Sequence, residues 1–136
     1  MAPGAGSVYR SHEDAATRGA CLTQIEALLL SVAIEAAVAW PLVAGLRWGH
    51  GARAALAAAV ATLLTHWPAW SGFQWLYEHL DYAPTLLVIE GCVIAAEWIA
   101  YRLVVPLPAA QALAASAIVN ASSTLVGVAL YVLDLA

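Results

Sequence analysis

Four glutamates lie inside long apolar stretches of this sequence. By residue type and position they are the strongest candidates in the chain for a chemical role. Glu26 and Glu35 fall in the first apolar stretch, and Glu90 and Glu97 fall in the third. A charged group at the centre of a bilayer costs at least about 2.5 kcal/mol, so such carboxyls face a protein interior or a wet cavity. Burial and a second carboxyl nearby both favour the protonated form. A protonated pair can exchange its proton for a cation, which is the chemical basis of coupled transport.

Helical spacing indicates which of these carboxyls can meet. Glu90 and Glu97 are two turns apart on one helix face, whereas Glu26 and Glu35 point to nearly opposite sides of their helix. Glu35 and Glu97 lie at a similar depth, roughly two-thirds of the way through their stretches, so we expect these two to approach each other. Glu90 is then an outer relay. A structural interpretation stays open, in which neutral glutamates bond across helices and stabilise the bundle by about 0.6–2 kcal/mol per bond.

Polar residues in the other two apolar stretches are candidate partners for these carboxyls. Ser116, Asn120 and Ser123 follow one helix face in the fourth stretch, at i, i+4 and i+7. A similar stripe in the second stretch consists of Thr62, Thr65 and His66. We therefore predict a polar seam between the helices, made by Glu35, Glu90, Glu97, Asn120, Ser116, Ser123 and Thr65.

A weak candidate for a metal site follows the second stretch and consists of His66, Glu78, His79 and Asp81. Imidazole and carboxylate groups can bind a metal ion, but the spacing matches no zinc signature, so solvated side chains are the favoured interpretation. Cys21 and Cys92 lack any paired spacing and are interpreted as small apolar residues. No cofactor is indicated, and the sequence has no HExxH, Walker or GxGxxG motif.

The composition predicts that lipid is the solvent for most of the surface. The 136 residues are 63% hydrophobic and 10% charged, with a mean hydropathy of +0.80, whereas soluble domains are about 25% charged. The net charge is -4 and the five basic residues are all arginines. A basic surface for nucleic acid is therefore excluded.

Four apolar stretches give the architecture, at about 22–46, 52–70, 84–105 and 108–133. Each is long enough to cross about 30 Å of hydrocarbon. We predict an all-α integral membrane protein with four transmembrane helices in one domain, 21–136, after a flexible polar tail, 1–20. The glutamate-bearing first and third stretches faintly resemble each other, and so do the alanine-rich second and fourth stretches. This repeat indicates two helical hairpins that are related as parallel copies.

Aromatic and basic residues predict the orientation. The segment 67–82 holds six aromatic residues and is expected to form an outer loop at the membrane interface, with a short helix near 74–78. Arg47 and Arg53 lie in the first connection and Arg102 begins the third, whereas the second has no arginine. The positive-inside rule then places the first and third connections in the cytoplasm and both termini outside. We expect a multi-pass protein of a cell membrane, specifically the bacterial inner membrane.

Three functions follow from these observations. Small size, an aromatic loop and small-residue faces favour an accessory or structural subunit of a membrane complex, or a homo-oligomer, with the lipid bilayer and copies or other membrane subunits as partners. The second function is a proton- or cation-coupled small transporter or channel that uses the intramembrane glutamates. The third, and least favoured, is a membrane enzyme or metal-binding protein with an outer-face histidine and glutamate site.

Overall fold

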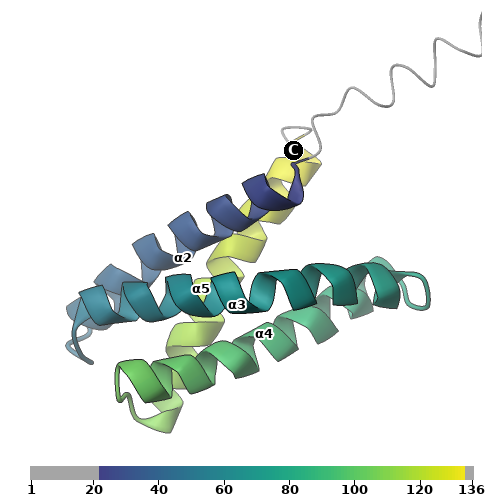
Figure 1. Cartoon of the computed structure of the whole chain (residues 1–136). Helices are drawn as coiled ribbons and strands as arrows, with labels where there is room; N and C mark the ends of the chain where they lie inside the picture. The colour runs from purple at the N-terminus through teal and green to yellow at the C-terminus, as the bar shows by residue number, and fades with distance from the viewer. Residues whose placement is uncertain (1–21, 134–136) are drawn as a thin grey trace, which may run out of the picture.

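The fold is a ring of four helices, as a computed structural model of the chain shows for residues 22–133. The helices are α2 (Gln24–Gly45), α3 (Gly51–Tyr77), α4 (Tyr82–Val104) and α5 (Ala109–Val132). α2 packs on α3, α3 on α4, α4 on α5, and α5 closes the ring on α2 (Figure 1). The all-α prediction is therefore confirmed. The predicted tail, 1–20, and Cys21 lie outside the described residues.

Three of these helices, α2, α4 and α5, are long and apolar enough to cross a membrane. They support the prediction of a membrane-embedded protein. α3 is the longest helix, with 27 residues, but it is less apolar and is not among the candidate spans within residues 22–133. The physical reason is its composition, because α3 carries Arg53, His66 and Gln74, and because its second half is rich in tryptophan and small polar residues. The fourth predicted span lacks the support that the other three have.

The segment expected to be an aromatic loop is mostly helical. α3 continues past Pro68 to Tyr77, and only 78–81 connects it to α4. A proline removes one backbone hydrogen bond from a helix, but packing on both sides can hold the chain in place. Here Phe73 packs edge-on against Tyr82 of α4, with ring centroids 5.8 Å apart. Contacts between α3 and α4 thus extend the helix beyond the point where its sequence pattern weakens.

The start of α2 explains the position of Glu26. Thr23 and Glu26 form a capping box, in which the Thr23 backbone N–H donates to Glu26 Oε2 at 2.8 Å and the Glu26 N–H donates to Thr23 Oγ1 at 3.3 Å. Both residues are exposed. Glu26, which the sequence places inside an apolar helix, is therefore a capping residue in its first turn.

α2 ends in a Schellman motif whose left-handed residue is not glycine. Arg47 has a φ of 55°, and its N–H donates to the carbonyl of Ala44. The Trp48 N–H donates to the carbonyl of Val43 at 3.0 Å. These two bonds satisfy carbonyls that a helix end otherwise leaves free.

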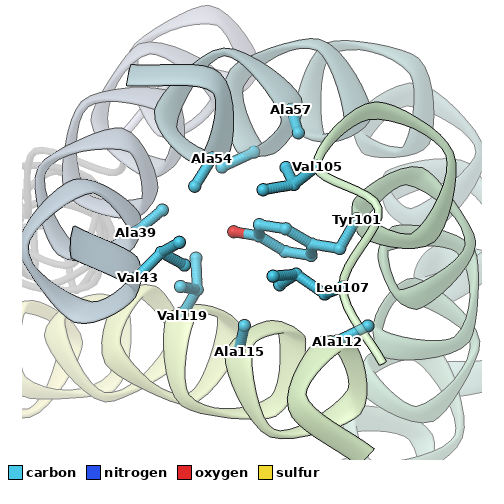
Figure 2. Close-up of a cluster of buried hydrophobic side chains, with 11 residues drawn as sticks. Ala39, Val43, Ala54, Ala57, Tyr101, Val105, Leu107, Ala112, Ala115 and Val119 are labelled. Carbon is cyan, nitrogen blue, oxygen red and sulfur yellow. The ribbon is translucent and has the colours of Figure 1, made fainter. Parts of the chain in front are cut away.

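The hydrophobic core lies at one end of the ring, which we name the closed end: the α2–α3 and α4–α5 connections and the helical turns next to them. Figure 2 shows apolar side chains from α2, α3, α5 and the α4–α5 connection around the ring of Tyr101. Small residues let helices approach closely, which is how transmembrane helices gain packing energy. The buried apolar set is Ala39, Val43, Ala54, Ala57, Ala58, Tyr101, Val105, Leu107, Ala112, Ala115 and Val119.

The buried positions of the two hairpins correspond at fixed spacings. Each of the α3 residues Ala54, Ala57, Ala58, Ala61 and Thr62 is buried, and so is the α5 residue 58 positions later in each case. On α2 and α4 the spacing is 62 positions, and it relates Glu35 to Glu97, Ala39 to Tyr101 and Val43 to Val105. Gly51 and Thr85 are buried without such a counterpart, so most of the pattern of buried positions is used twice.

The opposite end of the ring is open, and we name it the splayed end. There the start of α2 and the end of α5 lie together, away from the α3–α4 connection (Figure 1). Toward this end the pair formed by α2 and α5 diverges from the pair formed by α3 and α4. This divergence creates the cavity described below.

Candidate functional site

Glu35 of α2 is buried between two other helices, with 3% of its surface exposed. Thr62 Oγ1 of α3 donates a hydrogen bond to Glu35 Oε2. Ser123 Oγ of α5 donates to Glu35 Oε1 at 2.7 Å. Both carboxyl oxygens are thus held by hydroxyl groups from different helices. Thr62 lies on the polar stripe of the second apolar stretch, although the predicted seam takes only Thr65 from that stripe.

Glu97 of α4 is fully buried and takes its partners from α5. Its Oε2 accepts a hydrogen bond from Asn120 Nδ2, and Ser116 Oγ lies 3.5 Å from the same oxygen. Ser116 also donates to the Ile94 carbonyl at 2.9 Å. The Asn120 amide donates in addition to the Ser116 carbonyl of its own helix at 3.0 Å. This second bond fixes the amide against the carboxyl group.

The two carboxyl groups lie close together between the hairpins, because Glu97 accepts from Asn120 and Glu35 accepts from Ser123, one turn later on the same face of α5. Glu97 Oε1 has no hydrogen-bond partner within residues 22–133. Both oxygens of Glu35 already accept bonds from hydroxyl groups. A proton on Glu97 Oε1, donated to Glu35, would satisfy both groups with one negative charge between them, since two adjacent carboxylates repel each other. The arrangement suits a pair that binds one proton tightly.

Tyr101 lies one turn from Glu97 on α4 and closes the site toward the core. Its side chain is 0% exposed, and its hydroxyl points to the centre of the ring near Ala39, Val43 and Val119 (Figure 2). Among the described residues Tyr101 Oη has no hydrogen-bond partner. The sequence analysis missed Tyr101, although its i+4 spacing from Glu97 places it on the same helix face.

A cavity of about 560 Å³ runs from the splayed end to the carboxyl pair. Glu35, Asn120 and Ser123 line its inner end, while Glu97 lies behind them. Glu90 of α4 and Thr124 of α5 both lie in its wall. A solute that enters the cavity therefore reaches Glu90 and Glu35 but not Glu97.

The structure brings together five of the seven residues predicted to form the seam: Glu35, Glu97, Ser116, Asn120 and Ser123. Thr65 instead donates to the Ala61 carbonyl of its own helix at 2.9 Å. Thr65 and Glu90 are lining residues of the cavity rather than members of the hydrogen-bonded cluster.

The four weak metal candidates do not come together. The helix that extends from His66 to Tyr77 separates this histidine from 78–81 by about 20 Å along its axis. His66 Nε2 lies 3.2 Å from the Gln24 carbonyl of α2, and His79 Nδ1 lies 2.9 Å from the Trp75 carbonyl. Within residues 22–133 no three histidine, cysteine or acidic side chains are grouped so that they could hold a metal ion.

Comparison of the chain with protein-family models, curated proteins and solved structures finds no significant match. The function is therefore argued from the geometry of the carboxyl pair and the cavity.

Proposed function

We propose that the protein is a proton- or cation-coupled carrier of a cell membrane, and that the exchanged proton is held by Glu35 and Glu97. One observation carries this proposal: two buried carboxyl groups from different hairpins are bonded to neighbouring positions of α5 at the inner end of a cavity. A carboxyl pair with a purely structural role would not need a cavity that leads to it from outside the protein. Access through the cavity is what allows a proton to be replaced.

The charges around the site support exchange rather than a fixed ion pair. The arginines within residues 22–133 are Arg47, Arg53 and Arg102, and none of them lines the cavity. No arginine in the cavity wall therefore neutralises the carboxyl groups permanently. Their charge must be balanced by a proton or by a cation that enters, because an isolated charge in apolar surroundings is costly.

We also propose that the two hairpins are internal repeats. The matching buried positions on α3 and α5 support a relation between the hairpins by an axis that passes through the middle of the ring, normal to the membrane. Such an axis brings Glu35 and Glu97 to equivalent places, which explains why they meet. The three described arginines lie at or near the closed end, so the positive-inside rule supports an orientation with that end in the cytoplasm, and with the cavity and both termini on the outer side of a bacterial inner membrane.

The proposal is tested by following the protonated carboxyl band in the infrared spectrum of the protein in lipid nanodiscs across a pH titration. We expect a band that disappears as the pH rises and that is absent or shifted in Glu97→Gln. Glu78→Gln, which removes an exposed carboxyl outside the cavity, should retain the wild-type band. A wild-type protein without such a band, or a folded Glu97→Gln with an unchanged one, would contradict the proposal.

An accessory role in a membrane complex, or a homo-oligomer, is the alternative. It is favoured by Trp67, Trp75 and Tyr77 on the second half of α3, since each exposes more than half of its surface. Aromatic residues of this kind are enriched at interfaces. Native mass spectrometry of the protein extracted from its own membrane separates the carrier from an accessory subunit. Foreign subunits at a fixed ratio would support the accessory role, whereas the carrier proposal expects the chain alone or with its own copies.

A further inference from the structure

The wall of the cavity combines three kinds of side chain. Most of it is apolar, contributed by residues such as Leu86, Ile89 and Val93 of α4. Two carboxyl groups, those of Glu35 and Glu90, are the acidic groups of the lining. Aromatic rings come from three helices, and they are His66, Trp70, Phe73, Tyr82 and Tyr131.

The size of the cavity fits an organic molecule rather than a bare ion. Its volume of about 560 Å³ lies within the ~300–1,000 Å³ range of sites that bury a drug-sized ligand. A metal ion or a proton would make no contact with most of the apolar wall. The walls therefore require a ligand with an apolar body, one large enough to contact α3, α4 and α5 together.

The charge of the lining selects among such molecules. Anions are repelled by Glu35 and Glu90, and a neutral ligand would leave both carboxyl groups without a counterpart. A cation gains from the carboxyl groups, and the aromatic rings of the lining can add to this because they attract positive charge. Glu90 has the better position for first contact, since it lies nearer the splayed end on α4 than Glu35 does on α2, the helix diagonally opposite.

We propose that this cavity binds a monovalent organic cation with an apolar body, whose charge lies beside Glu90 and Glu35. This inference rests on the proposed function, because a cation that reaches Glu35 releases the proton shared with Glu97. The apolar body of the ligand packs against the aromatic rings between α3 and α5. The substrate class of the carrier is then a lipophilic amine or quaternary ammonium compound.

Calorimetric titration of the full chain in nanodiscs tests the inference with a matched pair of probes. Methyltriphenylphosphonium carries a permanent positive charge, and triphenylphosphine oxide has nearly the same shape without a net charge. We expect the cation to bind at least tenfold more tightly than the oxide. Glu90→Gln should weaken binding of the cation at least tenfold, and Glu78→Gln should leave it unchanged.

Tyr131→Leu supplies a second variant, since Tyr131 is an exposed residue near the end of α5 and its replacement leaves the core intact. It should weaken binding of the cation severalfold. Equal affinity for cation and oxide would overturn the inference, because the cavity would then be an apolar site for a lipid acyl chain. A folded Glu90→Gln that binds the cation with unchanged affinity would overturn it as well.

Proton release, measured by repeating the titration in buffers of different ionisation enthalpy, distinguishes the two proposals. A phosphonium ion carries no exchangeable proton, so any proton released comes from the protein. Cation binding that needs Glu90 but releases no proton supports the binding site and contradicts the exchange. A carboxyl band that titrates without any cation binding supports the proton site and overturns the inference about the ligand.

Discussion

Replacement of Tyr101 by phenylalanine should stabilise the protein. The Tyr101 side chain is completely buried, and its hydroxyl has no partner among the described residues. A buried hydroxyl left without a hydrogen bond costs about 1–3 kcal/mol, since it gave up its bonds to water. The ring itself packs among core residues from the other three helices and the α4–α5 connection (Figure 2). Tyr101→Phe keeps this packing and removes only the oxygen.

The expected gain in the free energy of unfolding is about 1–3 kcal/mol, less a small loss for the space that the oxygen filled. Titration with a denaturing detergent, followed by tryptophan fluorescence, measures this free energy for the wild type and each variant in the same micelles. Tyr131→Phe is the matched control, because Tyr131 is 71% exposed. Its unfolding free energy should change by less than about 0.5 kcal/mol.

A decrease in stability would refute this reasoning. If Tyr101→Phe lowers the unfolding free energy by about 1 kcal/mol or more, the hydroxyl makes a hydrogen bond in the bilayer. The natural partner would be a buried water shared with Glu97 Oε1, the second unpartnered atom on the same helix face. A change in the infrared carboxyl band of Tyr101→Phe would then locate that water.

Three further substitutions test the packing and the helix ends in the same unfolding assay. Gly51→Ala should lower stability by about 1–3 kcal/mol, because the new methyl group would lie 2.7 Å from the Trp40 carbonyl oxygen; Gly127→Ala, which meets open space, should be neutral or raise stability by up to about 1 kcal/mol. Arg47→Gly should raise stability by about 1 kcal/mol by relieving a left-handed backbone, whereas Arg47→Ala should give no gain. Thr23→Ala should cost about 0.5–2 kcal/mol and speed amide hydrogen exchange in the first turn of α2, and unchanged exchange there would contradict the capping role.

The sequence predicts the helices and part of the site because these depend on local pattern. The apolar stretches place α2, α4 and α5 within a few residues of their observed ends. The i, i+4, i+7 spacing places Ser116, Asn120 and Ser123 on one face, and the structure shows that face against the carboxyl groups. Depth along a straight helix is also a local property, and it indicates that Glu35 and Glu97 can meet.

Features that depend on how helices cross are not visible in the sequence. The continuation of α3 past Pro68 depends on contacts with α4, and the weak helical pattern there does not reveal it. The choice of Thr62 over Thr65 as the partner of Glu35 depends on the rotation of α3 about its axis. The cavity exists because the helix pairs diverge, and divergence leaves no signature in composition or spacing.

The bond from Ser123 to Glu35 spans 88 positions and joins the last helix to the first. During synthesis α2 and α3 are complete long before α5 leaves the ribosome, so Glu35 first has Thr62 as its hydroxyl partner. Its second partner and its neighbouring carboxyl arrive only with the other hairpin. Glu35 of the α2–α3 hairpin thus provides a specific contact for the α4–α5 hairpin when the two hairpins assemble. Two half-chains separated within 78–81 should consequently find each other in the same membrane and restore the ring.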